Sequence, residues 1–251
     1  MHPYINIGSQ LKIPLYNLLI AIGIIVGALF LEKEIKKYGI DFDTERKIFI
    51  FLIISFFCGV IGAKLYNFLL FNYSHQKLPL FFKYGVSFYG GLILGGFVFV
   101  LLIYFFCKNS VNFFINLIVP SLIIAHAFGR IGCFLAGCCY GKPTKSFLGM
   151  KFPPGSMPFI QYGNVKIHPV QLYSALFLFL LFVIIVKYVK FEYRVSAYFI
   201  GYGGFRFLIE FLRGDPRIFL ISNKISLSQF ISLIFFVTGW ILILIKKLKG
   251  R

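Results

Sequence analysis

The sequence predicts an all-α, polytopic membrane protein of about seven transmembrane helices with an ordered outer loop region, and three observations carry this prediction. Hydrophobic residues make up 59% of the 251 residues, and only 14% are charged, whereas a soluble domain is about one quarter charged. The mean hydropathy is +0.86. Apolar stretches of spanning length recur along the chain. A core of this size cannot hide so much apolar surface, so a bilayer must cover it.

Each apolar stretch is near the roughly 17–25 residues that a tilted helix needs to cross the hydrocarbon. We expect helices at 13–31, 48–71, 86–107, 111–129, 170–186, 195–213 and 225–245. The first stretch lacks a basic region before it and a small-residue cleavage site, so we do not interpret it as a cleavable signal peptide. The length leaves no room for a second globular domain. Residues 1–251 are therefore expected to form a single integral membrane domain.

The formal net charge of +18 indicates binding to nucleic acid, basic loops on the cytoplasmic side of a membrane, or binding to an anionic substrate. The basic residues lie in short loops between apolar runs, which disfavours nucleic acid. Thirteen Lys and Arg follow the first, third and fifth spans or lie at the C-terminus, and six lie in the short segments of the opposite side, with the long segment 130–169 left out of the count because of its length. The positive-inside rule then places the N-terminus outside and the C-terminus in the cytoplasm. The long Gly- and Pro-containing segment 130–169 should face outward as an ordered functional loop.

Charges inside the predicted spans are the most informative residues, because a charge in hydrocarbon costs at least about 2.5 kcal/mol. Arg206 and Glu210 lie four residues apart on one face of the sixth helix, with Arg213 one turn further. They form either a structural ion pair or a pair in which Glu210 holds Arg206 toward a polar cavity. Arg130 ends the fourth span. One carboxylate cannot neutralise two arginines, and a guanidinium fork suits phosphate, which indicates a lipid phosphate.

Two further groups of polar and small residues open predicted helices. Gly90 and Gly91 belong to a glycine-rich run at the start of the third span, where they serve close helix packing or approach a ligand. Tyr89 beside them could present its hydroxyl to the cavity. At the start of the fifth span lie His168, Gln171 and Tyr173, which by default form an interfacial belt.

Three of the five cysteines cluster in the sequence, at Cys133, Cys138 and Cys139. Four interpretations are open. The cysteines are inert small residues against a glycine-rich bend, they form an extracytoplasmic disulfide, they provide a reactive thiol, or they bind zinc together with His126. The spacing is unlike the usual zinc ligand pairs. We therefore expect no metal and no cofactor.

Five blocks, in order along most of the chain, resemble the bacterial phosphatidylglycerol–prolipoprotein diacylglyceryl transferases. Leu15-Tyr16-Asn17-Leu18 is similar to the family's first-helix Tyr-Gly-Leu, and Ser87-Phe88-Tyr89-Gly90-Gly91-Leu92 to its Ser-Phe-His-Gly-Gly-Leu. Gly129-Arg130-Ile131-Gly132 through Gly141 resembles its Gly-Arg-Ile-Gly-Asn-Phe-x-Asn-x-Glu-x-x-Gly signature. His168-Pro169 with Gln171-Leu172-Tyr173, and Gly201-Tyr202-Gly203 through Arg213, resemble the last two blocks. Together the five blocks are a specific match, although any one is weak.

This resemblance implies transfer of diacylglyceryl from phosphatidylglycerol to the lipobox cysteine thiol of prolipoproteins, with release of glycerol phosphate. The implied place is the outer side of the bacterial plasma (inner) membrane, and the implied partners are phosphatidylglycerol, prolipoprotein signal peptides and bilayer lipids, without nucleic acid. The implied catalytic residues are Arg130, Arg206, Glu210 and Tyr89. The implied substrate-binding residues are Arg130, Tyr16, Gly90, Gly91, His168, Gln171 and Tyr173.

The sequence departs from the family pattern where hydrogen-bonding groups are expected. Tyr89 replaces the histidine of the third-helix block, and Cys133, Ala136 and Cys138 replace two asparagines and a glutamate of the signature. A neutral tyrosine, with a pKa of about 10, is a poor general base at neutral pH. The alternative function is therefore a non-catalytic or differently specific protein that binds anionic lipid on the same scaffold. A transporter is a weaker third reading, because no paired broken-helix repeats are visible.

Overall fold

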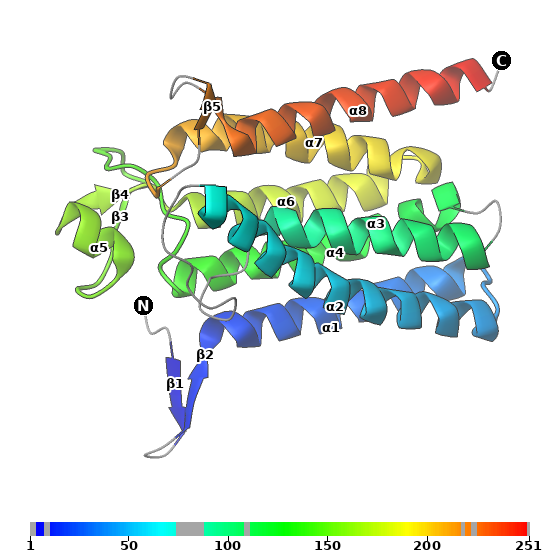
Figure 1. Cartoon of the computed structure of the whole chain (residues 1–251), viewed down its shortest axis with the longest axis horizontal. Coiled ribbons are helices and arrows are strands. Elements are labelled where there is room, and N and C mark those ends of the chain that lie inside the picture. Colours follow the sequence, from blue (N-terminus) through cyan, green and yellow to red (C-terminus); the bar gives the residue numbers. More distant parts are fainter. Residues whose placement is uncertain are drawn as a thin grey trace. The chain divides into compact units, whose positions relative to one another are not determined.

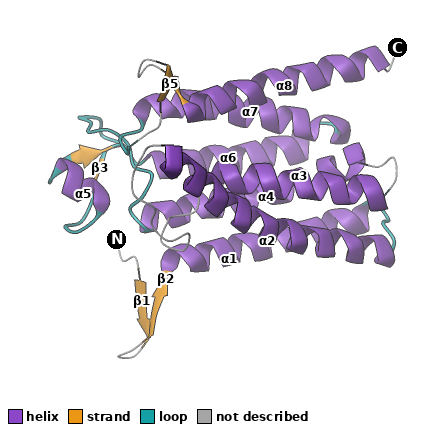
Figure 2. Cartoon of the chain, in the orientation of Figure 1, coloured by secondary structure: helices purple, strands orange, loops and turns teal. Residues whose placement is uncertain are grey.

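Long helices dominate the chain, as Figures 1 and 2 show. The computed structural model describes residues 4–7, 11–73, 88–107, 111–216, 219–221 and 225–249. The seven helices that match the predicted spans are α1 (Leu15–Lys37), α2 (Phe42–Tyr73), α3 (Phe88–Phe106), α4 (Val111–Leu135), α6 (Val170–Tyr188), α7 (Arg194–Ile209) and α8 (Leu227–Lys249). The predicted fold class is therefore confirmed.

The helices have the length and composition of membrane spans. Among the described residues, α1, α2, α4, α6 and α8 are long and apolar enough to cross a membrane, and α3 contributes a shorter apolar stretch, Gly90–Phe106. Their outward faces carry exposed large apolar side chains such as Ile25, Phe57 and Leu180. Because water would not tolerate so continuous an apolar surface, a bilayer must cover it. The chain is a multi-pass membrane protein.

The remaining elements are short. Three antiparallel hairpins pair β1 (Tyr4–Ile7) with β2 (Leu11–Pro14), β3 (Met150–Lys151) with β4 (Lys166–Ile167), and β5 (Phe219–Ile221) with β6 (Ile225–Ser226). The helix α5 (Met157–Tyr162) and the 3-10 turns η1 (Phe191–Tyr193) and η2 (Glu210–Leu212) complete the described structure.

The chain forms two compact units, residues 1–33 with 116–251, and residues 34–115. The expectation of a single membrane domain stays a prediction. In the second unit, α2 and α3 pack through glycines. A Cβ on Gly90 would collide with the backbone oxygen of Gly62 and the Cβ of Tyr66, and one on Gly95 would lie 2.8 Å from the Ser55 oxygen. Side chains at these positions would force the two helices apart.

The first unit contains the helices that carry the charged residues. An aromatic stack joins α6 to α7, with the Phe177 and Phe205 ring centroids 4.1 Å apart. At the start of α7, the buried Asn116 of α4 accepts a hydrogen bond of 3.0 Å from the Val195 amide. Gly203 of α7 approaches the backbone of α8 closely, since a Cβ there would lie 2.8 Å from the Ser232 oxygen. These contacts hold α4, α6, α7 and α8 around the polar residues described next.

Two helix ends differ from the sequence prediction. The fourth predicted span ends at residue 129, whereas α4 continues to Leu135, so Arg130 lies within the helix. The sixth ends at residue 213, whereas α7 ends at Ile209 and Arg213 is extended, with ψ 139°. The apolar composition predicted a helix to residue 213, but α7 ends at Ile209. Arg213 therefore does not share the helical face of Arg206 and Glu210.

The segment that follows α4 is folded, as expected for an ordered loop. Its centre is a small apolar cluster of the buried Tyr140, Phe152 and Ile167. Backbone hydrogen bonds dock it on the end of α7, from the Lys142 amide to the Leu212 carbonyl at 2.8 Å and from the Gly214 amide to the Tyr140 carbonyl at 3.0 Å. This loop therefore packs against the segment that carries Arg213.

Candidate active site

The ion pair between Arg206 and Glu210 is buried, as the four-residue spacing predicts. The Nη1 atom of Arg206 lies 2.5 Å from Oε2 of Glu210, and the residues are 5% and 7% exposed. The hydroxyl of Ser226 donates a second hydrogen bond, of 2.9 Å, to the other carboxylate oxygen of Glu210. Glu210 therefore joins the end of α7 to the start of α8, and both of its oxygens are engaged.

A capping box at the start of α8 positions Ser226. The Gln229 amide donates to the Ser226 hydroxyl oxygen at 3.1 Å, and the Ser226 amide donates to Oε1 of Gln229 at 3.0 Å. This reciprocal pattern satisfies two amides of the first helical turn. The Ser226 hydroxyl oxygen accepts from the Gln229 amide, and the hydroxyl proton is donated to Glu210. The sequence Ser-Leu-Ser-Gln could have predicted this cap.

Arg130 makes its described hydrogen bonds with neutral groups. Its Nε donates to Nε2 of His126 at 3.1 Å, and its Nη2 donates to the Tyr202 hydroxyl at 3.3 Å. Tyr202 lies on α7, one turn before Arg206, so Arg130 of α4 is tied to the helix that carries the ion pair. The aromatic rings of His126 and Tyr202 meet edge to face, with centroids 5.0 Å apart. Arg130 is half-buried.

A second ion pair follows α7. The Nε and Nη2 atoms of Arg213 donate to Oδ1 and Oδ2 of Asp215, each at 2.8 Å, so the pair is bidentate. Gly141 of the folded loop bridges to Arg213 along the backbone. Burial raises the pKa of the Asp215 carboxyl to about 6, although the charge of Arg213 acts in the opposite direction. Neither Arg213 nor Asp215 is among the site residues that the sequence predicts.

Three arginines and two carboxylates thus gather around the ends of α4 and α7. Arg206 is paired with Glu210, Arg213 is paired with Asp215, and Arg130 adds a third guanidinium. His126 lies within electrostatic range of both Arg130 and Arg206. The formal charges sum to one positive unit, so the group is suited to an anion. The catalytic roles of Arg130, Arg206 and Glu210 stay predictions.

The three clustered cysteines are brought together by the turn that ends α4. Gly137 adopts a positive φ of 69°, its amide donates to the Phe134 carbonyl, and the Cys138 amide donates to the Cys133 carbonyl. These two bonds define a Schellman motif, which brings the residue after the glycine, Cys138, against Cys133, five residues earlier. Cys139 follows with a positive φ of 61°, which is unusual for a side chain with a Cβ. A glycine after an apolar helix is the sequence signal that could have predicted this pairing.

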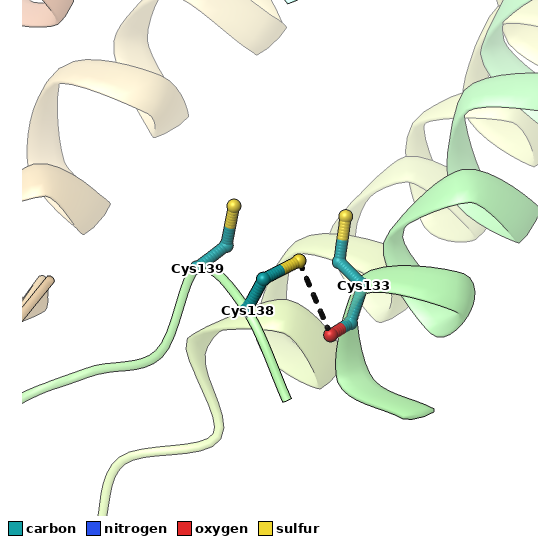
Figure 3. A group of neighbouring side chains, drawn as sticks. All are labelled: Cys133, Cys138 and Cys139. Atoms are coloured by element: carbon teal, nitrogen blue, oxygen red, sulfur yellow. Dashed lines mark hydrogen bonds between the residues drawn. The ribbon is translucent and has the colours of Figure 1, made fainter. Parts of the chain in front are cut away.

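The three sulfur atoms lie within 4.8 Å of one another. Figure 3 shows the sulfurs of Cys133 and Cys139 projecting to the same side, while that of Cys138 points to the Cys133 carbonyl, 3.6 Å away. Hydrogen bonds from Cys133 and Cys138 lower the pKa of the Cys139 thiol, and the positive charges of Arg213 and Arg130 act in the same direction. All five cysteines are free thiols in the structure.

Four of the predicted substrate-binding residues surround this cluster and its loop. The ring of Tyr16 packs on Gly132, and Tyr16 lies within electrostatic range of the three thiols and Arg130. The amide of the buried Gln171 donates to the Cys138 carbonyl at 2.7 Å. His168 and Tyr173 interact with each other at 3.3 Å, and Tyr173 also donates to a loop carbonyl. His168, Gln171 and Tyr173 therefore support the loop and the thiols, and their contact with a substrate stays a prediction.

The predicted residues on α3 belong to the second unit. Gly90 and Gly91 both face α2, Gly90 against Gly62 and Gly91 against Gly59. Helix packing therefore accounts for both glycines, and their role in binding substrate stays a prediction. Tyr89 lies in the first turn of α3, and its side chain lies outside the described residues. The role predicted for Tyr89 stays untested.

The fold defines a multi-pass helical membrane protein, and its described polar site contains three arginines and two carboxylates. Residues 3–245 match the family described as prolipoprotein diacylglyceryl transferase. The chain is 38% identical to phosphatidylglycerol–prolipoprotein diacylglyceryl transferase of Clostridium tetani, covering 91% of each chain. It is 37% identical to the second such enzyme of Clostridium perfringens, covering 96% of this chain and 94% of the relative.

A more distant relative of the same name, from Prochlorococcus marinus, is 30% identical over 98% of this chain and 92% of its own. The likeness therefore extends over nearly the full length of each relative. The chain belongs to the prolipoprotein diacylglyceryl transferase family and is a transferase. The resemblance inferred from the five sequence blocks is confirmed.

Proposed function

We propose that this chain transfers the diacylglyceryl group of phosphatidylglycerol to the lipobox cysteine thiol of prolipoproteins. The observation that carries the proposal is the gathering of Arg130, Arg206 and Arg213 around Glu210 and Asp215 among the described residues. The printed names of the relatives specify both substrates. The reaction joins a thiol sulfur to a glyceryl carbon and expels glycerol phosphate, so negative charge increases on the phosphate in the transition state.

Arg130 and Arg206 are the groups assigned to that phosphate. A guanidinium fork binds two oxygens at once, and fixed donors aimed at developing charge supply the largest single contribution to many reactions. Glu210 orients Arg206, and Ser226 in turn holds Glu210. Arg213 lies just after η2, against the docked loop, and is engaged by Asp215. The division of roles is binding by Arg130 and Arg206, and positioning by Glu210.

The reaction is assigned to the outer side of the bacterial plasma (inner) membrane. The Lys and Arg asymmetry between the two sets of loops supports an outside N-terminus and a cytoplasmic C-terminus. The partners on this proposal are phosphatidylglycerol, prolipoprotein signal peptides and the surrounding bilayer lipids, with no nucleic acid. Reporter fusions after Lys246 should give a cytoplasmic signal, and an external signal there would contradict the orientation.

Transfer in a defined system tests the proposed function. Purified protein in vesicles with radiolabelled phosphatidylglycerol should label a lipobox peptide, and the same peptide with serine in place of cysteine should remain unlabelled. Arg130→Lys and Arg206→Lys keep the charge but lose the fork, so we expect transfer to fall by roughly 10- to 100-fold. Lys151→Arg on β3 is an exposed control that should leave transfer unchanged.

A differently specific protein that binds anionic lipid on the same scaffold is the second candidate, because Tyr89 and Cys138 stand where the family pattern has a histidine and a glutamate. It predicts that phosphatidylglycerol binds in an arginine-dependent manner without any labelled peptide product. Restoration of lipoprotein modification in a depleted bacterium separates the two functions in cells. Restoration supports the transferase, and binding without restoration supports the second candidate.

A further inference from the structure

The three-thiol cluster has the geometry of an open zinc site. Three sulfurs bound to one Zn²⁺ at about 2.3 Å lie roughly 3.8 Å apart around a tetrahedral ion. The sulfurs of Cys133, Cys138 and Cys139 lie within 4.8 Å of one another, so small rotations of the side chains would bring them to that separation. Three protein ligands leave one coordination position open, which is the usual form of a catalytic zinc site.

The cluster also has the supporting contacts that a metal site needs. The backbone of Cys138 is held at both of its polar groups, by the Cys133 carbonyl on one side and by the Gln171 amide on the other. Gln171 is 2% exposed, and its Oε1 has no hydrogen-bond partner within the described part of the chain. An acceptor left in this state is poised for a water or a ligand beside the thiols. Such outer contacts orient the ligands of a metal.

Charge balance favours a thiolate-rich site at this position. A zinc ion with three thiolates carries one net negative charge, and a fourth thiolate makes it two. Arg130 and Arg213 lie within electrostatic range of the Cys139 sulfur. The two guanidinium groups offset that charge, which would otherwise be costly to bury.

The proposed reaction needs a thiolate, and three nearby bases are engaged. A free cysteine has a pKa of about 8.5 and is mostly a thiol at neutral pH. Glu210 is bound by Arg206 and Ser226, and Asp215 is bound by both nitrogens of the Arg213 fork. The Nε2 atom of His126 already accepts a hydrogen bond from Arg130. Coordination to a cation removes the need for a base, because a thiol bound to zinc is deprotonated outright.

We propose that Cys133, Cys138 and Cys139 bind one Zn²⁺ whose open position receives the thiol of the acceptor cysteine. This inference rests on the proposed function, and it replaces the expectation from sequence that no metal is bound. The proton of the acceptor thiol leaves to water as the thiolate binds the ion. The thiolate sulfur then attacks the glyceryl carbon that bears the phosphate, so that a C–S bond forms and the C–O bond breaks.

The electron pair of the broken C–O bond stays on the phosphate oxygen, and glycerol phosphate leaves with it. The product sulfur is a neutral thioether, which is a weaker ligand than a thiolate and dissociates from the ion. Zinc keeps its charge throughout, so the step needs no oxidant or reductant. The three cysteines act as ligands, and the nucleophile comes from the substrate.

Metal content is the first measurement. Protein purified in detergent and loaded with Zn²⁺ should retain one ion per chain after gel filtration. Cys138→Ser and Cys139→Ser should each weaken the affinity by more than about 100-fold, beyond what loss of a supporting contact costs. Cys58→Ser and Cys107→Ser lie in the other unit and serve as matched controls that should retain the ion. Absence of bound zinc, equal loss in the controls, or a disulfide within the cluster of protein handled under reductant-free conditions would overturn the proposal.

Cobalt substitution tests the open position without any need for turnover. In Co²⁺-loaded wild-type protein, a lipobox peptide should intensify the thiolate-to-cobalt charge-transfer band, and its serine analogue should not. A spectrum that does not respond to the peptide thiol overturns the open position. Transfer that proceeds at full rate in chelator-treated, zinc-free protein overturns the inference and leaves the proposed function intact. Peptide coordination without any transfer supports the metal site and removes the proposed function instead.

Discussion

Two helix pairs of this chain pack through glycine, and they differ in what the close contact holds. Between α2 and α3, glycines on both helices face one another, and the close contacts are with backbone atoms and aliphatic carbons. Between α7 and α8, Gly203 brings the backbones together in the same way, but Glu210 accepts from Ser226 across the contact. Close approach serves packing in the first pair and in the second pair also places a carboxylate against a helix cap.

Breaking the buried ion pair should have the largest effect. Arg206→Ala leaves Glu210 without its guanidinium partner, which we expect to cost about 3–5 kcal/mol of stability and to lower transfer roughly 100- to 1000-fold. The double variant Arg206→Met with Glu210→Leu removes both charges and should recover most of the stability but none of the transfer. Thermal unfolding in detergent and the transfer assay measure the two quantities. Recovery of both in the double variant would mean that the pair is only structural.

The glycine contact of α2 and α3 should show a smaller effect on stability. Gly90→Ala places a methyl group against the backbone of Gly62, so we expect a loss of about 1–3 kcal/mol. Gly96→Ala is the matched control on the same helix, because a Cβ there meets no atom within 4 Å. The control should be neutral or stabilising by up to about 1 kcal/mol, since alanine favours helix. Equal unfolding temperatures for the two variants would contradict the close packing.

The second ion pair should give the chain a pH dependence. The pKa of Asp215 rises from 3.8 to about 6 on folding because the carboxyl is buried, so folding takes up a proton in this range. Its contribution to stability is then full below about pH 4 and is lost as the pH rises through 6. Because 17% of the Asp215 side chain is still exposed, we expect this contribution to the free energy of unfolding to change by about 1–2 kcal/mol. The stability of wild type relative to Asp215→Asn should fall from pH 4 to pH 7, and a constant difference would exclude the shift.

The mildest change removes one hydrogen bond from Arg130. Tyr202→Phe keeps the ring that meets His126 and deletes the hydroxyl that accepts from Arg130. We expect the binding free energy of phosphatidylglycerol to weaken by about 0.5–1.5 kcal/mol, which corresponds to a threefold to tenfold rise in its KM. Tyr104→Phe, on the exposed face of α3, is the control and should leave KM unchanged. An unchanged KM in Tyr202→Phe would show that Arg130 is positioned by other contacts.

The sequence predicts the helices and the Arg206–Glu210 pair because both depend on local spacing. Apolar runs set the spans, and a separation of four residues places two side chains on one helical face. The sequence did not predict the pairing of Arg213 with Asp215, because a 3-10 turn ends α7 before Arg213 is reached. Nor did it predict that Glu210 would meet Ser226, since sixteen residues separate them and only the packing of α8 on α7 brings them together.

The cysteine cluster lies between these two cases. The sequence shows the three cysteines beside glycines, but their spacing is unlike the usual zinc ligand pairs. The positive φ of Gly137 and of Cys139 turns the chain back over its own helix end, so that sequence spacing no longer measures spatial separation. Rules based on spacing in regular helices therefore fail where a helix ends in a left-handed residue.

The turn at the end of α4 has a consequence for how the protein is made. The bonds that gather the thiols join residues 133, 134, 137 and 138, so they need no later part of the chain. Contacts this local form on the time scale of helix and turn formation, as soon as α4 has left the ribosome and entered the bilayer. Tyr202 of α7, which accepts from Arg130, and Glu210 of η2, which pairs with Arg206, are synthesised many residues later. The nascent protein thus acquires its thiol group first and its phosphate-binding arginines only when the last two helices have been inserted.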